Sequence, residues 1–161
     1  MTRTETVGII CKGDFVLLGL KKKRFGKGKY NGFGGGVEKN EIYEEAITRE
    51  VKEESGINVI FPEHMGKIFY EFDGGEQDHI IHFFKITDYK GIPKESDEMI
   101  PKWFYKNNLP YEKMWEDSKY WLPMLLEDKK FYGEVSYDEN HKIKKYFLNE
   151  IKMNIVCSKW L

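Results

Sequence analysis

The sequence predicts a single α/β (α+β) domain in which helices cover the faces of a mixed β-sheet. Short segments rich in β-branched and aromatic residues recur along the chain and are separated by turn residues, which is typical of strands. Two segments between them have helical periodicity instead. The 161 residues, 40% hydrophobic and 33% charged, are enough for one domain with a proper core. Because no repeat, low-complexity tract or linker divides the chain, we assign residues 1–161 to one domain.

The first part of the sheet is expected to begin with a hairpin. Residues 4–11 and 15–20 are predicted strands joined by a Lys12-Gly13-Asp14 turn. The basic segment 21–30 is punctuated by glycine and predicted to be a loop, and residues 32–37 form a short glycine-rich strand or turn. Further strands are predicted at residues 57–60, 66–72, 79–86 and 100–105.

The first helix is predicted from about Glu41 to Ser55, with Gly56 placed as the residue just past its end. A loop at residues 91–97 precedes the strand at 100–105. The second helix is predicted from Ser118 to about Glu127. Because proline is tolerated best in the first turn of a helix, Pro123 leaves the first residue of this helix undetermined. Its inward-facing residues are expected to be Trp121, Leu122, Leu125 and Leu126.

A second hairpin is expected to close the sheet. Residues 131–137 and 143–148 are predicted strands, and the turn between them lies around Asp138-Glu139-Asn140.

Three carboxylates near the end of the first helix are the most informative feature of the sequence. Glu50, Glu53 and Glu54 are spaced i, i+3, i+4, so they project from one face of the helix. Like charges at that spacing repel, which calls for a compensating group. A bound divalent metal is the obvious candidate.

A helical wheel at about 100° per residue places these carboxylates on the apolar side of the helix. They share an arc with Ala46 and Ile47, which is expected to face the protein body. Uncompensated charge there would be costly, so a merely solvated acidic face is disfavoured. The outward face is expected to carry Glu44, Glu45, Thr48, Lys52 and Ser55.

The window from Gly35 to Ile57 resembles the Nudix signature G-x5-E-x7-R-E-U-x-E-E-x-G-U, in which U is aliphatic. The match holds at every fixed position. These positions are Gly35, Glu41, Arg49, Glu50, Val51, Glu53, Glu54, Gly56 and Ile57.

The resemblance extends over roughly residues 6–150 and is strongest to the MutT-type branch of oxidised purine nucleoside triphosphatases (8-oxo-dGTP diphosphatase-like). The segments that carry it include LLGLKKKRFGKGKYNGFGGG, ESDEM and MWEDSKYW. It implies an α/β/α sandwich whose carboxylate-bearing helix is the Nudix helix.

A Mg²⁺ site is predicted from these residues, with Mn²⁺ as an alternative ion. Mg²⁺ prefers oxygen ligands and takes a few carboxylates together with water and substrate phosphates. Glu50, Glu53 and Glu54 supply such oxygens, and the resemblance adds Glu98 and the Gly34 carbonyl. Either Glu54 or Glu98 is the candidate general base.

Arg49 is assigned a supporting role at the catalytic centre. Its five fixed donors suit a bridge to a nearby carboxylate, which would orient the metal ligands. Glu41 is expected to have a similar structural role near the helix start. Gly34, Gly35 and Gly36 are expected to let the backbone approach phosphate closely.

The resemblance also implies a set of nucleotide-binding residues. Asn31 carries an amide that can both donate to and accept from a purine edge. Trp115 offers a stacking face, whereas core packing is the favoured role for Trp121. The implied set is Thr6, Lys21, Asn31, Phe33, Tyr70, Phe72, Trp115, Asp117 and Ser118.

Two positions depart from the family pattern. Asp117 is followed by Ser118 where the branch has adjacent aspartates, and Gly36 stands where it has lysine. The paired acids read the oxidised base by hydrogen bonding. A serine cannot tune the pKa of its neighbour as a second carboxylate does, so the preferred purine is left open.

The predicted function is that of a Mg²⁺-dependent pyrophosphohydrolase. It would convert oxidised purine nucleoside triphosphates such as 8-oxo-dGTP to the monophosphate and pyrophosphate, and so cleanse the nucleotide pool. The alternatives are a broad-specificity nucleoside triphosphate pyrophosphatase and an RNA 5′-pyrophosphohydrolase. A non-catalytic nucleotide sensor is the least favoured, because the ligand set is intact.

Charge and composition limit the partners of this protein. The net charge of −1 gives no electrostatic case for binding duplex nucleic acid or a membrane surface. The absence of a disulfide framework, a signal peptide and a long apolar run favours a cytoplasmic protein.

Cys11 is expected in the core. A monomer is expected, with a dimer as the alternative, and the extension 153–161 has no assigned role.

The histidines have no metal-ligand spacing and are predicted to be structural or on the surface. His79 and His82 lie three apart in a predicted strand, so they are expected on opposite faces.

Overall fold

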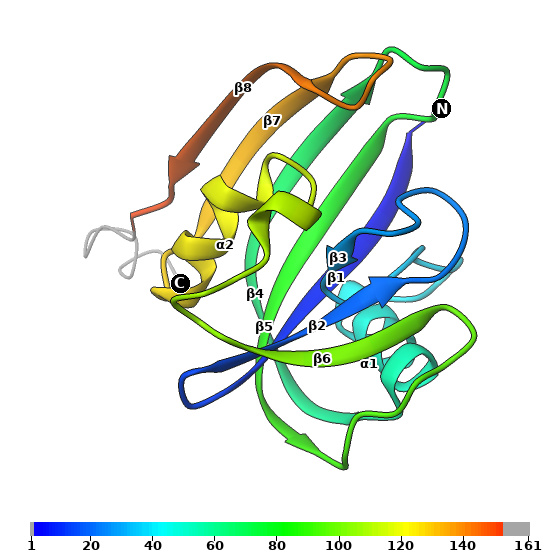
Figure 1. Ribbon diagram of the computed structural model, residues 1–161, viewed down its shortest axis with the longest axis vertical. Helices are drawn as coiled ribbons and strands as arrows, with labels where there is room; N and C mark the ends of the chain where they lie inside the picture. Colours follow the sequence, from blue (N-terminus) through cyan, green and yellow to red (C-terminus); the bar gives the residue numbers. More distant parts are fainter. Residues whose placement is uncertain (1, 153–161) are drawn as a thin grey trace.

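The computed structural model describes residues 2–152 (Figure 1). Within that range the strands form one mixed sheet in the order β3-β2-β1-β5-β4-β7-β8, and β6 pairs with β2. The β1–β5 and β4–β7 pairs are parallel, and the other pairs are antiparallel. The elements are β1 (Arg3–Lys12), β2 (Phe15–Lys21), β3 (Tyr30–Asn31), α1 (Tyr43–Ser55), β4 (Asn58–Phe72), β5 (His79–Lys90), β6 (Met99–Tyr105), the 3₁₀ turn η1 (Tyr111–Lys113), α2 (Ser118–Leu126), β7 (Phe131–Tyr137) and β8 (Ile143–Glu150).

The sheet lies between the two α-helices, and its interior strand β1 is buried on both faces. Val7, Ile9 and Cys11 alternate onto the face that packs against α2, whereas Ile10 faces the cluster that contains α1. Helix α1 approaches the backbone of β1 so closely that a Cβ on Gly8 would lie 3.0 Å from Ile47 Cδ1. This arrangement confirms the predicted α/β/α layers and the core position of Cys11.

The two helices agree with prediction over most of their length. Helix α1 begins at Tyr43 rather than Glu41, because Ile42 is extended at the N-cap (φ −82°, ψ 162°). Gly56 ends it in the left-handed region (φ 77°) and donates its N–H to the Lys52 carbonyl, as the sequence indicated. Pro123 lies inside α2, which begins at Ser118 as predicted.

The strands differ from prediction mainly in length. The segments expected at residues 57–60 and 66–72 form one strand, β4, which continues through Pro62. Register shifts on both sides of Phe61 and after His64 allow this, because a bulge accommodates a proline that cannot join the hydrogen-bonding ladder. Strand β5 likewise continues to Lys90. The short elements β3 and η1 were not predicted.

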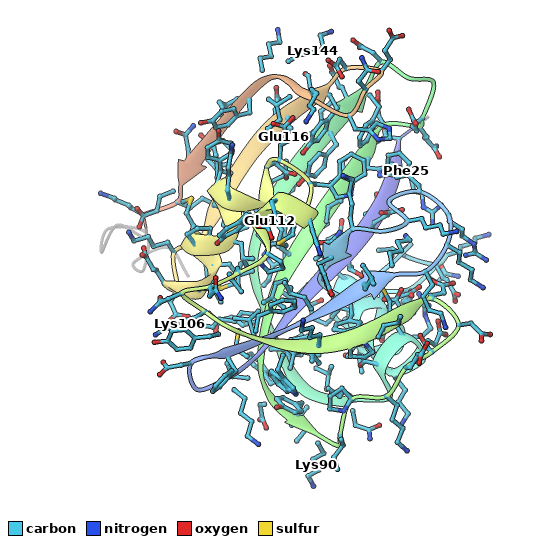
Figure 2. The ribbon with its side chains drawn as sticks, in the orientation of Figure 1. Phe25, Lys90, Lys106, Glu112, Glu116 and Lys144 are labelled. Carbon is cyan, nitrogen blue, oxygen red and sulfur yellow. The ribbon has the colours of Figure 1, made fainter. Side chains whose placement is uncertain are left out.

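The periphery of the molecule is charged. Lys90, Lys106 and Lys144 are exposed and point away from the body of the protein (Figure 2). Neither helix described in residues 2–152 is long and apolar enough to cross a membrane. Cys157 and the extension 153–161 lie outside the described residues.

Replacing Ile47 with alanine should destabilise the fold by about 2–5 kcal/mol, the usual cost of emptying a fully buried isoleucine site. The same change at Ile42, whose side chain is 59% exposed at the start of α1, should cost far less. Chemical denaturation of both variants measures this difference. Equal losses would show that α1 is not held by its contact with Gly8.

Candidate active site

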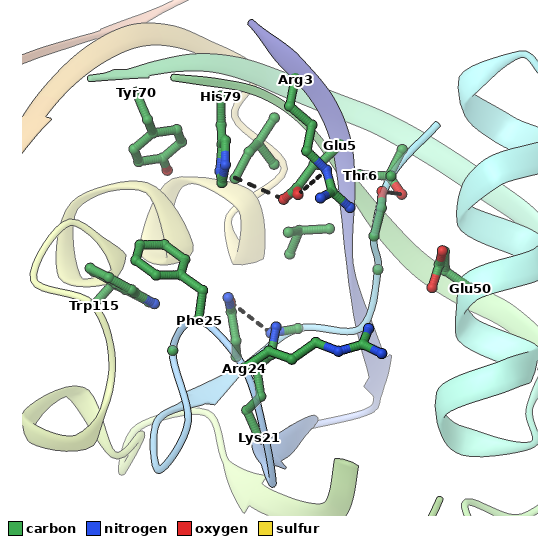
Figure 3. Close-up of a pocket in the computed structure, with 18 of the residues that line it drawn as sticks. Arg3, Glu5, Thr6, Lys21, Arg24, Phe25, Glu50, Tyr70, His79 and Trp115 are labelled. Atoms are coloured by element: carbon green, nitrogen blue, oxygen red, sulfur yellow. Dashed lines mark hydrogen bonds and ion pairs between the residues drawn. The ribbon is translucent and has the colours of Figure 1, made fainter. Parts of the chain in front are cut away.

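A cleft of about 630 Å³ connects the C-terminal half of α1 with the start of α2 (Figure 3). This volume lies in the usual range for sites that hold a small molecule. Carboxylates lie at the α1 end, aromatic rings at the α2 end, and basic side chains between them. The predicted residues that line it are Thr6, Lys21, Asn31, Gly34, Gly35, Gly36, Arg49, Glu50, Glu53, Glu54, Tyr70, Phe72, Glu98, Trp115, Asp117 and Ser118.

Phe33 is the exception among the predicted binding residues. Its side chain is fully buried in the core cluster beneath α1 and does not line the cleft. A Cβ on Gly19 would lie 2.9 Å from the Phe33 ring, so this residue packs against β2. The backbone of Phe33 pairs with Gly8 in a short antiparallel bridge. The predicted contact of Phe33 with a ligand stays a prediction.

Arg49 organises the carboxylates at the α1 end of the cleft. Its Nε and Nη2 donate to the two oxygens of Glu41 at 2.8 and 2.9 Å, and Nη1 donates to Glu50 Oε1 at 2.8 Å. Nη2 also donates to the Gly36 carbonyl at 3.0 Å. The guanidinium therefore ties the loop before α1 to the carboxylate face of the helix, which is the bridging contact that the sequence predicted.

These contacts shift the pKa values of the groups involved. The hydrogen bonds from Arg49 lower the pKa of Glu41 to about 2. The hydrogen bond to Glu41 raises the pKa of Arg49. Burial raises the pKa of Glu50, although the contact with Arg49 opposes that rise. Glu41 is thus a fixed anion, whereas Glu50 is an acid whose charge is costly.

Glu54 is the most buried carboxylate of the cleft, at 5% exposed. Its Oε1 accepts the Gly34 N–H at 2.7 Å. Burial raises its pKa to about 8, and the nearby charges of Glu50 and Glu98 add to the rise. One acidic residue from the preceding turn of α1 and one from the segment before β6 therefore act on this buried carboxyl group.

The wheel prediction for α1 is correct for Glu50 and Glu54, which face the body of the protein. It is wrong for Glu53, whose side chain is 59% exposed at the rim. It is also wrong for Ser55, which is fully buried because the chain after β5 covers the end of the helix, where Lys94 donates its N–H to the Ser55 carbonyl. A wheel cannot show which loops return to cover a helix end.

Glu98 comes from the segment before β6 and is held by the basic loop that follows β2. Arg24 Nη1 lies 3.2 Å from Glu98 Oε1, and the Lys22 N–H donates to the Glu98 carbonyl. The left-handed backbone of Arg24 (φ 67°) turns this loop toward the cleft. The loop thus brings positive charge next to the carboxylates.

The chemistry of these residues fits a hard divalent cation, since every side-chain donor is a carboxylate oxygen. Glu50, Glu54 and Glu98 would hold it, with Glu53 and the Gly34 carbonyl nearby. Within residues 2–152, no three His, Cys, Asp or Glu side chains converge closely enough to enclose an ion as they stand. Glu50 and Glu98 are engaged by arginines in this arrangement, so binding a cation requires those contacts to be exchanged.

The loop before α1 requires glycine because its backbone lies very close to neighbouring atoms of β1 and α1. A Cβ on Gly34 would lie 1.9 Å from the Thr6 carbonyl oxygen, and one on Gly35 would lie 2.6 Å from the Glu50 carboxyl carbon. The Thr6 N–H donates to the Gly35 carbonyl at 2.8 Å. The loop therefore lies directly against β1 and the carboxylate-bearing face of α1.

The other end of the cleft is built from aromatic rings around Asp117. Asp117 is 3% exposed, and the hydroxyls of Tyr70 and Tyr137 each donate to one of its carboxylate oxygens at 2.5 Å. Tyr70 and Phe72 project from β4, and Trp115 precedes α2. Trp121 is 2% exposed and packs on Phe83, as predicted, and it also lines the cleft and forms a side-chain hydrogen bond with Asp117.

The sequence did not predict three residues at this end: Phe25, Tyr137 and His79. Phe25 lies in the basic loop, with its ring 5.1 Å from Trp115 and 5.3 Å from Phe72. A lone large aromatic among lysines and glycines was the available signal. His79 packs on Phe72 at 5.5 Å, whereas nothing local distinguishes Tyr137 from a core residue.

His79 and His82 lie on opposite faces of β5, as predicted. His82 stacks on Tyr43 of α1 at 3.8 Å, and its Nδ1 lies 2.9 Å from His64 Nε2. Figure 3 shows His79 beside Tyr70, with Glu5 between His79 and Arg3.

Comparison with known proteins agrees with this geometry. A model of the NUDIX domain matches residues 2–125. The chain is 39% identical to an oxidized purine nucleoside triphosphate hydrolase of Mus musculus over 150 residues, covering 93% of this chain and 96% of that protein. It is 40% identical to the protein of the same name from Danio rerio over 147 residues, covering 91% and 94%. The crystal structure of a mutator MutT protein from Bacillus halodurans superposes with a TM-score of 0.82 at 30% identity, covering 91% of this chain and 97% of that one.

Replacing Arg49 with lysine should weaken divalent-cation binding about 10- to 100-fold, as loss of a residue that orients metal ligands usually does. Lysine retains the charge but cannot reach Glu41 and Glu50 together. Isothermal titration calorimetry with Mn²⁺ measures the affinity of the variant and of the unchanged protein. An affinity equal to that of the unchanged protein would show that the bridge has no part in metal binding.

The stability of the metal-free protein should fall as pH rises from about 4.5 to about 8. In that window folded Glu54 keeps a proton that the unfolded chain has released, since its pKa is raised from 4.5 to about 8. Proton release then opposes folding, with a slope of at most about 1.4 kcal/mol per pH unit. Denaturation of the protein and of Glu54→Gln at several pH values measures this. The glutamine variant should lack that part of the slope, and an unchanged slope would contradict the assignment.

Proposed function

Because this chain belongs to the Nudix family of hydrolases, we propose that it is a divalent-metal-dependent pyrophosphohydrolase acting on oxidised purine nucleoside triphosphates such as 8-oxo-dGTP. The products would be the nucleoside monophosphate and pyrophosphate. The observation that supports this most is the single cleft with carboxylates at one end and a ring-lined pocket with a buried acid at the other. The names of the mouse and zebrafish relatives support the choice of substrate.

The carboxylate end is where the phosphoanhydride bond would be cleaved. Bound Mg²⁺ or Mn²⁺ would neutralise phosphate charge and make a water molecule more acidic. Glu50, Glu53, Glu54, Glu98 and the Gly34 carbonyl are the proposed ligands. The contact of Arg49 with Glu50 would be exchanged when the cation binds, while the contacts of Arg49 with Glu41 and with the Gly36 carbonyl keep the guanidinium beside the carboxylates.

Glu54 is the better-supported general base of the two candidates. The Gly34 N–H fixes Oε1 and so orients the carboxyl group, which would accept a proton from the attacking water. Burial also raises the pKa of Glu54, and a base working near neutral pH needs such a shift. Glu98 is paired with Arg24 and its side chain is 33% exposed, so it is better suited to ligand binding.

The middle of the cleft suits the triphosphate. Lys21, Arg24 and Arg3 line the cleft, as does Lys29, whose Nζ lies 5.2 Å from the centroid of the Trp115 ring. Their positive charges face the carboxylates across the site, and a polyphosphate with its metal would lie between the two sets. Figure 3 shows Lys21 and Arg24 on the side of the cleft opposite Tyr70.

The aromatic end suits the purine. Trp115 and Phe25 provide faces for stacking. Asn31 Oδ1 accepts the Gly32 N–H at 2.9 Å, so its amide nitrogen remains to donate to an acceptor on the base. Thr6, Phe72, Asp117 and Ser118 complete the proposed pocket.

One chain supplies all of these residues, so we propose that the monomer is the active unit. The cytoplasm, which contains the nucleotide pool, is its proposed location.

Release of pyrophosphate from 8-oxo-dGTP should require Mg²⁺ and exceed that from dGTP by about tenfold or more in kcat/KM, which corresponds to about 1.4 kcal/mol. At saturating Mg²⁺, Glu54→Gln should lower kcat about 10²- to 10⁴-fold, the usual contribution of a general base. Glu44→Gln, an exposed change on the same helix, is the matched control.

Other outcomes would revise particular parts of the proposal. Equal turnover of oxidised and ordinary triphosphates would favour a broad pyrophosphatase. A larger loss in Glu98→Gln than in Glu54→Gln would transfer the role of base to Glu98. No turnover of any triphosphate would overturn the enzymatic proposal.

A further inference from the structure

The ring of Phe25 lies at the aromatic end of the cleft, although it belongs to the basic loop (residues 22–29) and not to the sheet. Its centroid lies 5.1 Å from that of Trp115, 5.3 Å from that of Phe72 and 5.4 Å from that of His141. It meets Phe72 and His141 at 89° and 81°, the edge-to-face arrangement that aromatic rings favour. Rings on three other segments therefore contact this loop, and Figure 3 shows Phe25 beside one of them, Trp115.

The backbone of the basic loop does not by itself fix the position of Phe25. Gly26 and Gly28 have positive φ values of 88° and 87°, and glycine reaches many other conformations at little steric cost. Two hydrogen bonds close the base of the loop. The Lys21 N–H donates to the Lys29 carbonyl at 3.0 Å, and the Gly28 N–H donates to the Lys21 carbonyl at 2.9 Å. The ring contacts of Phe25 therefore add directly to the closure of this loop on the cleft.

His141 does not line the cleft, yet its ring contacts both Phe25, at 5.4 Å, and Trp115, at 4.9 Å. It lies in the turn between β7 and β8 with a left-handed backbone (φ 60°), and its N–H donates to the Asp138 carbonyl at 3.0 Å. Asp138 Oδ1 accepts two further N–H groups of the same turn, at 2.8 and 2.9 Å. A turn with these internal hydrogen bonds presents the imidazole ring in a defined position behind the two aromatic rings.

Glu76 holds the imidazole of His141 from the neighbouring turn. Its Oε1 lies 3.3 Å from His141 Nε2. Hydrogen bonds with its own backbone and with His141 lower the pKa of Glu76, so its carboxylate is an acceptor at neutral pH and Nε2 carries the hydrogen. The other oxygen, Oε2, is buried and has no hydrogen-bond partner within residues 2–152. The pairing with His141 is thus the contact that compensates this carboxylate.

The contact between Glu76 and His141 joins two hairpin turns. Glu76 lies between β4 and β5, His141 lies between β7 and β8, and the two turns lie side by side (Figure 1). A second ion pair joins the same hairpins, from Lys144 Nζ to Asp73 Oδ2 at 2.7 Å, and neither of its residues lines the cleft. Of these two pairs, the one with His141 contacts the rings of the aromatic end.

We propose that His141 and Glu76 are positioning residues that hold the rings of Phe25 and Trp115 at the aromatic end and so keep the basic loop closed on a bound nucleotide. This inference rests on the function proposed above and adds the residues that control the closure of its site. The same loop carries Arg24, which lines the middle of the cleft, so its closure bears on the triphosphate as well as on the base.

A role in closure has a kinetic signature that a role in folding lacks. His141 and Glu76 lie at the end of the cleft away from the carboxylates of α1, so their contribution is the same for the bound substrate and for the transition state. Loss of such a uniform contribution raises KM and leaves kcat unchanged. If the pair merely joined the two hairpins, its loss would reduce the amount of folded enzyme without changing KM.

His141→Ala should raise KM for 8-oxo-dGTP about tenfold and change kcat by less than about twofold. Lys144→Met breaks the other ion pair between the same hairpins, so it should leave KM unchanged and is the matched control. Steady-state kinetics at saturating Mg²⁺ measure both constants. An unchanged KM in His141→Ala, or an equal rise in Lys144→Met, would overturn the inference.

A double variant tests whether Glu76 acts through His141. Glu76→Gln should raise KM about threefold in the unchanged background, because a neutral amide accepts a hydrogen bond more weakly than a carboxylate. In His141→Ala the same change should have no further effect. Glu76 itself lines the cleft, so direct contact with the nucleotide is the competing explanation. A further threefold rise in the double variant would show direct contact and overturn the positioning role of Glu76.

Hydrogen exchange in the protein without nucleotide tests the same closure without turnover. The N–H groups of Lys21 and Gly28, which close the base of the loop, should exchange about tenfold faster in His141→Ala than in Lys144→Met. The amides of β7 should exchange equally in both variants. Equal rates at Lys21 and Gly28 would overturn the inference. Faster exchange without Mg²⁺-dependent turnover of any triphosphate would support the role of His141 in closure and would be a failure of the proposed function alone.

Discussion

Burial of negative charge at the end of α1 is the constraint on which the rest of the site depends. Glu50 and Glu54 are held against the glycine loop, although each carboxylate loses hydration there. Arg49 and the Gly34 N–H supply the compensating contacts. Because Gly34 and Gly35 lie against the Thr6 carbonyl and the Glu50 carboxylate, the loop packs closely against both β1 and the helix. Side chains that are already held in place lose little conformational freedom when a ligand binds. A scaffold of this kind can therefore present several carboxylates to one cation at a small entropic cost.

The sheet links this unit to the opposite end of the cleft. Strand β1 contacts α1 on one face and the cluster beneath α2 on the other, so one strand supports both ends. The parallel pairing of β4 with β7 brings Tyr70, Phe72 and Tyr137 to the same face. The carboxylate end and the aromatic end of the cleft are therefore supported by one sheet. The basic loop after β2 closes the space between them through Arg24 and Phe25.

Buried acids at the two ends have opposite surroundings. Glu54 has carboxylate neighbours and one N–H donor, so burial and repulsion together raise its pKa to about 8. Asp117 accepts hydrogen bonds from the hydroxyls of Tyr70 and Tyr137 and from the side chain of Trp121. The first environment suits proton transfer and cation binding. The second suits a fixed pattern of hydrogen-bond acceptors.

The sequence by itself determined the layered fold, the helix that carries Glu50 and Glu54, and the bridging role of Arg49. These features follow from local spacing, because the periods of helix and strand set which neighbours share a face. Only the tertiary structure decided that Glu53 lies at the rim, that Phe33 is buried, and that β4 is continuous. It also decided the surroundings of Asp117, whose tyrosine partners lie 20 and 47 residues away along the chain. Contacts at such separations depend on strand order and register, which no local pattern of side chains contains.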